Sequence, residues 1–72
     1  MITAQEFEAK TAKLKKDITL AKPQLTGGYY PTAFYLTEDE IADTISFIEA
    51  NPQSPLIENY TVIGWLLFYK PQ

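Results

Sequence analysis

An apolar run without charged residues lies near the C-terminus and reads Tyr-Thr-Val-Ile-Gly-Trp-Leu-Leu-Phe-Tyr, residues 60–69. Its β-branched and aromatic residues favour a strand, with a short buried helix as the alternative. Alternation assigns the side chains to two faces: Tyr60, Val62, Gly64, Leu66 and Phe68 on one, and Thr61, Ile63, Trp65, Leu67 and Tyr69 on the other. Because both faces are apolar, we expect a central strand covered on both sides.

The first part of the chain repeats apolar side chains at steps of three and four, which predicts an amphipathic helix over residues 2–22. Thr3 and Glu6 have the spacing of a capping box, in which each side chain bonds a backbone N–H near the helix start. Glu6 precedes Lys10 by four residues, the favourable order for a helical ion pair. Pro23 is expected to end the helix. The apolar stripe consists of Ala4, Phe7, Thr11, Leu14, Ile18 and Ala21.

A second capping box, Thr37 with Glu40, predicts another helix over residues 38–50. Acidic residues fill its first turn, where the positive end of the helix dipole favours them. Phe47 lies off the expected apolar stripe, and Asn51 is expected to end the helix in the left-handed conformation. The stripe itself is predicted to consist of Ile41, Ile45 and Ile48.

The connecting segments are rich in glycine and proline. Residues 23–28 are expected to form a turn. Residues 29–36 contain many strand-forming side chains, but Pro31 cannot donate to a ladder, so we expect an edge strand or a strand that begins after it. Residues 56–57 are a candidate short strand, joined to the last one by a hairpin.

These elements predict a single α+β domain over residues 1–72, in the order α-β-α-(β)-β. Two helices pack on a two- or three-stranded sheet with the C-terminal strand central. Parallel pairing of the two main strands, through a right-handed crossover over the second helix, is one arrangement that this order allows. One core of this size supplies only about 3–5 kcal/mol. Since the chain has no cysteine and no histidine, self-association as a homodimer is the common support that remains.

Charge is distributed unevenly along the chain. Residues 1–22 hold five lysines and three carboxylates, a net charge of +2, whereas residues 23–72 hold one lysine and six carboxylates, a net charge of −5; the sum is −3. The N-terminal residues lack the pattern of a secretory signal. The uncharged C-terminal run is about half of the roughly 20 residues that span a membrane. We therefore expect a cytoplasmic protein without a membrane partner.

The residue types argue against an enzyme. Histidine and cysteine, the usual general base and thiol nucleophile, are missing. Asp39 and Asp43, four residues apart on one helix face, are the one pair that suggests a magnesium site, but Asp39 also complements the helix dipole and Asp43 reads as a solvated charge. We expect no catalytic residues, no metal and no cofactor.

Nucleic-acid binding is also disfavoured. The lysines of the first helix are spread around its polar circumference instead of lying on one face. A base-stacking platform needs cationic residues around its aromatic rings, and no lysine or arginine occurs between Pro23 and Tyr69. A nucleic-acid-associated protein that uses these lysines remains the third hypothesis.

The aromatic residues favour a protein-binding role. Nine of the ten lie at or after Tyr29. We expect Phe34 or Tyr35, together with Trp65 and Phe68, to fill the core. The remaining aromatics beside carboxylates predict a contact surface for a partner with basic groups. Its residues are Tyr29, Tyr30, Phe47 and Tyr69 as anchors, with Glu38, Asp39, Asp43 and Glu49 as steering charges.

The leading hypothesis is thus a small acidic domain that binds another protein and acts sterically, as inhibitors and anti-defence proteins of mobile elements do. The alternative is a structural component that forms a permanent homo-oligomer.

Overall fold

The computed structural model describes residues 2–21 and 28–71. The predicted turn and the proline expected to end the first helix lie largely outside these ranges. Within them, the elements are helices α1 (Ala4–Leu20) and α2 (Glu38–Ala50), the 3-10 turns η1 (Thr32–Phe34) and η2 (Pro55–Ile57), and strands β1 (Tyr30–Pro31), β2 (Tyr60–Ile63) and β3 (Leu66–Tyr69).

The described strands form one antiparallel sheet in the order β1-β3-β2. The α+β class and the central position of the C-terminal strand are therefore confirmed. The parallel crossover that the order of elements allows does not form, because β1 runs antiparallel to β3, with Tyr30 opposite Tyr69 and Pro31 opposite Phe68. Strand β1 lies at an edge, as Pro31 requires.

Residues 60–69 form a β-hairpin instead of the single strand that their apolar character predicts. Ile63 pairs with Leu66, and Gly64 and Trp65 make the two-residue turn between them. Gly64 has φ of +63°, the positive value that the first central residue of such tight turns requires. The turn changes which side chains share a face of the sheet. Tyr60 and Tyr69 were predicted to lie on opposite faces of one strand, but they lie opposite each other and both face the core.

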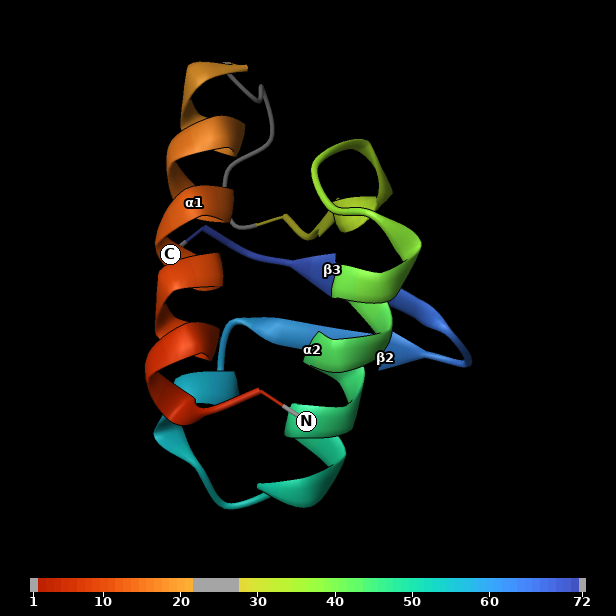
Figure 1. Ribbon diagram of the computed structural model, residues 1–72. Coiled ribbons are helices and arrows are strands. Elements are labelled where there is room, and N and C mark those ends of the chain that lie inside the picture. The colour runs from red at the N-terminus through yellow and green to blue at the C-terminus, as the bar shows by residue number, and fades with distance from the viewer. Residues whose placement is uncertain (1, 22–27, 72) are drawn as a thin grey trace.

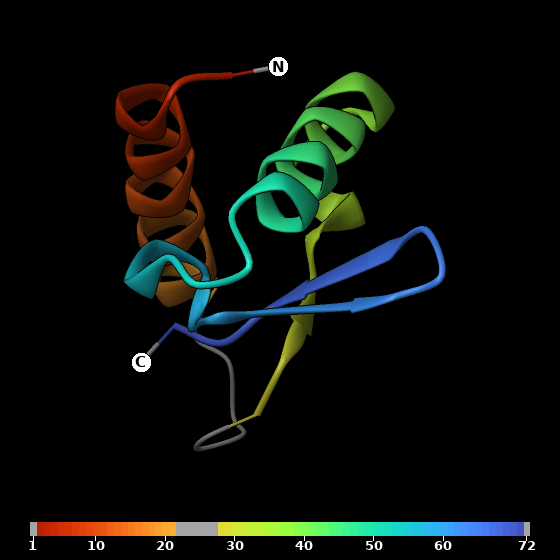
Figure 2. The ribbon, with the colours of Figure 1, turned by 90° about the horizontal axis from the view of Figure 1, so that it is seen from below.

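The molecule has two layers of described elements. Helices α1 and α2 run antiparallel to each other on one side of the hairpin (Figures 1 and 2). No described element covers the other side, so the expected cover on both faces is wrong for this part of the chain. By register, that outer face carries Thr61 and Ile63 of β2 and Leu66 and Phe68 of β3.

Helix α1 begins as predicted. The Thr3 hydroxyl accepts from the Glu6 amide at 3.1 Å and the Glu6 carboxylate accepts from the Thr3 amide at 2.8 Å. The backbone bond to Thr3 lowers the pKa of Glu6. The Lys10 ammonium forms its ion pair with Glu40 of α2 at 3.2 Å. The predicted ion pair of Lys10 with Glu6 is absent among the described residues, and Lys10 instead joins the two helices.

Helix α2 also has its capping box, but it buries a different face from the one predicted. Its buried side chains are Thr44 and Phe47, while the isoleucines are half-buried beside them. Phe47 stacks on Phe7 of α1 and is 5% exposed, and an aromatic ring of this size contributes a large share of the apolar surface buried in a small core. Asn51 has φ of −132°, so it is not left-handed; its side-chain amide donates to the Phe47 carbonyl at 2.9 Å.

Two short segments differ from their predictions. Residues 29–36 form only a two-residue strand, and the chain then turns at η1, where the Thr32 hydroxyl donates to the Leu67 carbonyl at 2.9 Å. Residues 56–57 belong to η2 instead of a strand. Ser54 starts that turn by accepting from the Leu56 amide at 3.2 Å.

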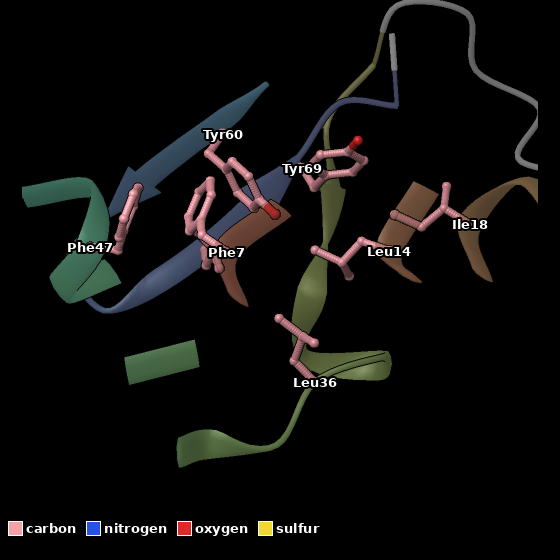
Figure 3. Packing of buried hydrophobic residues seen from close by; sticks show 8 residues of the cluster. Phe7, Leu14, Ile18, Leu36, Phe47, Tyr60 and Tyr69 are labelled. Carbon is pink, nitrogen blue, oxygen red and sulfur yellow. The ribbon is translucent and has the colours of Figure 1, made fainter. Parts of the chain in front are cut away.

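The core lies between the helices and the inner face of the sheet (Figure 3). Phe7 stacks on Phe47 with 4.3 Å between ring centroids and contacts Tyr60 at 5.2 Å; Tyr60 in turn meets Tyr69 at 5.0 Å. Aliphatic side chains complete the cluster: Leu14, Ile18, Leu36 and Leu67. Neither described helix combines the length and apolar character needed to cross a bilayer.

Candidate functional site

Large apolar side chains are exposed at the hairpin turn. Trp65 is 86% exposed, Ile63 62% and Leu66 54%. Trp65 was expected to fill the core, and that prediction is wrong because the turn carries it past the end of the sheet. Phe34 is 83% exposed on η1, so of the alternative pair Phe34 and Tyr35 it is Tyr35 that packs against the core.

A hollow of about 360 Å³ lies between this turn and α2. We call it the tip groove, and its lining residues are Glu38, Ile41, Ala42, Ile45, Trp65 and Leu66. Binding pockets for small molecules begin at about 300 Å³, so the tip groove has room for a large side chain of a partner. Tryptophan is also one of the residues enriched at the contacts that dominate the energy of protein interfaces.

Two elements build the tip groove. On the hairpin, Gly64 permits the tight turn, so Trp65 projects from its second central position. On α2, the lining residues 38, 41, 42 and 45 follow at helical steps of three and four, which places them on one stripe. That stripe lies on the flank of α2 away from α1, as the position of the hairpin end in Figure 2 shows.

A smaller hollow adjoins the tip groove and shares Ile41, Trp65 and Leu66 with it. It follows β3 beyond the point where the two-residue β1 ends. There the Thr32 hydroxyl donates a hydrogen bond to the Leu67 carbonyl, which a further strand would need as an acceptor. Because that carbonyl is already bonded, the smaller hollow along β3 is suited to receive side chains of a partner and not an added strand.

The carboxylates of α2 divide between three faces. Glu38 lines the tip groove, and Glu49 is exposed one turn beyond Ile45 on the same stripe. Asp39 and Asp43 are exposed on the outward face and do not line the groove. Glu40 lies on the flank toward α1, where its bond to the Thr37 backbone and its pairing with Lys10 lower its pKa.

The predicted aromatic anchors are not brought together. Phe47 and Tyr69 are 5% and 2% exposed and belong to the core, so their assignment to a contact surface is wrong. Tyr30 is half-buried against the core. Tyr29 is 45% exposed, but it lies beside β1 and outside the lining of the tip groove.

The buried tyrosine hydroxyls serve the fold. The Tyr60 hydroxyl shares a hydrogen bond of 2.9 Å with the Thr11 hydroxyl. Burial raises the pKa of Tyr60 to about 12 against the opposing effect of that bond, and burial also raises the pKa of Tyr69. Both shifts move ionisation of the side chains to more alkaline pH, because burial in an apolar cluster disfavours the charged form.

Asp39, Asp43 and the lysines of α1 do not line the tip groove. Within residues 2–21 and 28–71, no three carboxylates lie close enough to hold a metal ion. Of the lysines of α1, Lys10 pairs with Glu40, and Lys13 bonds the Asp17 carboxylate and the Tyr35 carbonyl, each at 3.2 Å. Lys15 and Lys16 are exposed.

Sequence reasoning missed the hairpin residues of this site, Trp65 and Leu66. One signal was available: a glycine halfway along a ten-residue apolar run, with four strand-forming residues on either side of a Gly-Trp pair. A glycine at the first central position is typical of one kind of two-residue hairpin turn. Comparisons with protein-family models, with curated proteins and with solved structures found no match to this chain.

Proposed function

We propose that this protein is a non-enzymatic domain that binds another protein through the tip groove and acts sterically. The observation that carries the proposal is the exposure of Trp65 at 86% beside an apolar hollow, in a chain small enough to need every large side chain for its core. Leaving that much apolar surface in water lowers solubility without adding stability. Burial of Trp65 against a partner would remove this surface from water and so account for its exposure in the free protein.

The site suits a protein partner better than a small molecule. The groove is open, and Leu66, which lines it beside Trp65, is more than half exposed. An apolar centre with a polar margin is the usual arrangement of a protein contact. Glu38 of α2 lines the groove, which favours a partner that brings a basic group.

A pull-down from extracts of the native host tests the proposal. Immobilised wild type is compared with Trp65→Ala and with Leu20→Ala, a matched truncation of a side chain that is 68% exposed on α1. We expect the wild type and Leu20→Ala to retain the same partner and Trp65→Ala to lose it. Equal retention by all three variants would show that the tip groove is not the binding site.

Charge-reversed variants of α1 separate this proposal from nucleic-acid binding. Lys15→Glu combined with Lys16→Glu changes exposed lysines and leaves the bonded Lys13 in place. We expect this variant to retain the partner. We also expect the partner to stay bound after the extract is treated with nuclease. Loss in either case would favour a nucleic-acid role for α1.

A permanent homo-oligomer is the second candidate. It is favoured by the outer face of the sheet, on which Ile63 and Leu66 are exposed and which no described element covers. The same face could pack on its copy by twofold symmetry. The concentration dependence of unfolding, described in the Discussion, distinguishes this candidate from a monomer that binds a different protein.

A further inference from the structure

The tip groove combines an apolar floor with a carboxylate, and that combination specifies the chemistry of its occupant. We infer that it binds a linear peptide segment that inserts one large apolar side chain between Trp65 and α2 and places a lysine or arginine against Glu38. This inference rests on the proposed function, since it names the kind of segment that the partner presents.

The apolar part of the occupant follows from the lining. Ile41, Ala42 and Ile45 form one wall and Trp65 with Leu66 the other. The volume of about 360 Å³ admits an aromatic or long aliphatic side chain, and such anchors in well-packed pockets carry most of the energy in known interfaces. Because Trp65 is 86% exposed, its surface is available to close over that side chain.

The basic part follows from charge. Glu38 is the charged residue of the lining, and Glu49 continues its stripe of α2. The chain carries no lysine or arginine between Pro23 and Tyr69, and therefore none on α2 or in the hairpin. Among the described residues, neither Glu38 nor Glu49 forms an ion pair of the kind that joins Glu40 to Lys10. A cation on the occupant would complement Glu38, the carboxylate that lines the groove.

A peptide anchored by its side chains fits better than one that adds a strand. The hollow along β3 contains Thr32, whose hydroxyl already bonds the Leu67 carbonyl at 2.9 Å. Strand addition depends on such main-chain groups being free. A peptide across the groove would leave that bond intact.

A second copy of this chain fits less well. Twofold packing of one tip groove on another would bring together two Glu38 carboxylates and two hairpin turns without a basic residue. Like charges placed against each other in a contact disfavour it. The occupant is therefore expected to come from a different protein.

Selection from a library of random linear peptides tests the inference directly. The library is selected on the wild type after depletion on Trp65→Ala. We expect the enriched peptides to share an aromatic or long aliphatic residue next to lysine or arginine. Enrichment of Trp65-dependent peptides without basic residues would overturn the inference and leave the proposed function standing. Failure to enrich any Trp65-dependent peptide would also overturn it, while the host pull-down would still decide the proposed function.

A matched pair of neutralising variants then measures the role of Glu38. A synthetic copy of an enriched peptide is titrated while the fluorescence of Trp65, the single tryptophan of the chain, reports its burial. Exchanging Glu38 for glutamine should weaken binding about threefold at low salt. Asp43→Asn removes the same charge from the outward face of α2 and should leave affinity unchanged. Equal effects of the two variants, or none from Glu38→Gln, would overturn the assignment of Glu38.

Discussion

Phe47 shows what a single side chain contributes to this small core. Its ring stacks on Phe7 at 4.3 Å and is 5% exposed. We expect Phe47→Ala to lower the free energy of unfolding by about 3–5 kcal/mol, which is comparable to the whole stability of a domain of this size. Urea denaturation followed by circular dichroism would measure the change.

Trp65→Ala is the control for that experiment, because it truncates a larger ring that is 86% exposed. Its free energy of unfolding should stay within about 0.5 kcal/mol of the wild type. A large loss for Trp65→Ala, or none for Phe47→Ala, would contradict the core described here.

Ionisation of Tyr60 is expected to lower the free energy of unfolding at alkaline pH. Its pKa is raised from 10.0 to about 12, first by burial. A raised pKa means that the folded protein holds the proton more tightly than the unfolded chain. The stabilisation is therefore complete below about pH 10 and is lost as the pH rises toward 12, and Tyr69, whose pKa is also raised, acts in the same direction.

Urea denaturation at a series of pH values would measure this loss, which we expect to be on the order of 2 kcal/mol for Tyr60. Tyr60→Phe should make the pH dependence shallower. The Thr11 hydroxyl would keep a partner in this variant, because it also donates to the Phe7 carbonyl at 3.1 Å. An unchanged pH dependence in Tyr60→Phe would refute the role of this hydroxyl.

The β2–β3 hairpin depends on the backbone of its turn. Gly64 has φ of +63°, and a Cβ added there would meet no atom within 4 Å. The cost of Gly64→Ala is therefore conformational, and we expect about 1 kcal/mol of destabilisation. Asparagine accepts positive φ more readily than alanine, so Gly64→Asn should lose less.

Thermal or urea unfolding of the two Gly64 variants would test the turn. Equal stability of Gly64→Ala and the wild type would mean that residue 64 does not have positive φ in solution. Because the same turn positions Trp65, we also expect Gly64→Ala to weaken partner binding more than its small loss of stability would suggest.

The molecule as a whole has a core on one side of its sheet and an apolar face on the other. Ile63 and Leu66 on that face are more than half exposed. If the chain is a monomer awaiting a different partner, the midpoint of thermal unfolding is independent of protein concentration. We expect that result, because the tip groove and its carboxylate do not complement themselves.

A homo-oligomer would behave differently, since association with the folded state raises the unfolding midpoint with concentration. Light scattering over the same concentration range would report the mass directly. A mass above that of one chain, together with a midpoint that rises with concentration, would favour the permanent homo-oligomer and make the outer face its interface. Ile63→Ser should then lower both values.

Local patterns predicted the helices accurately. Both capping boxes form as expected, and α1 buries Phe7, Leu14 and Ile18 of its predicted stripe. The α+β class and the central C-terminal strand could also be predicted, because they follow from the types of element and from the position of the apolar run. The hairpin was not, since a Gly-Trp pair is a weaker turn signal than Asn-Gly.

The site could be predicted only in part. Glu38 was identified as a contact residue from its position on an acidic helix, but Trp65 was assigned to the core and Phe47 to the surface, the reverse of what the structure has. A helical wheel cannot say which flank of α2 a neighbouring helix will cover. Strand alternation, in turn, fails beyond an unrecognised two-residue turn.

The sequence by itself determined where the helices begin, which residues stabilise their ends and how the charges are divided between the two parts of the chain, because these depend on neighbours within a few positions. Tertiary structure alone decided that Phe47 meets Phe7, that Lys10 reaches Glu40 and that Trp65 stands beside α2. Those contacts join residues far apart in the chain, and they exist only because the helices share one face of the sheet while the hairpin turn extends beyond it.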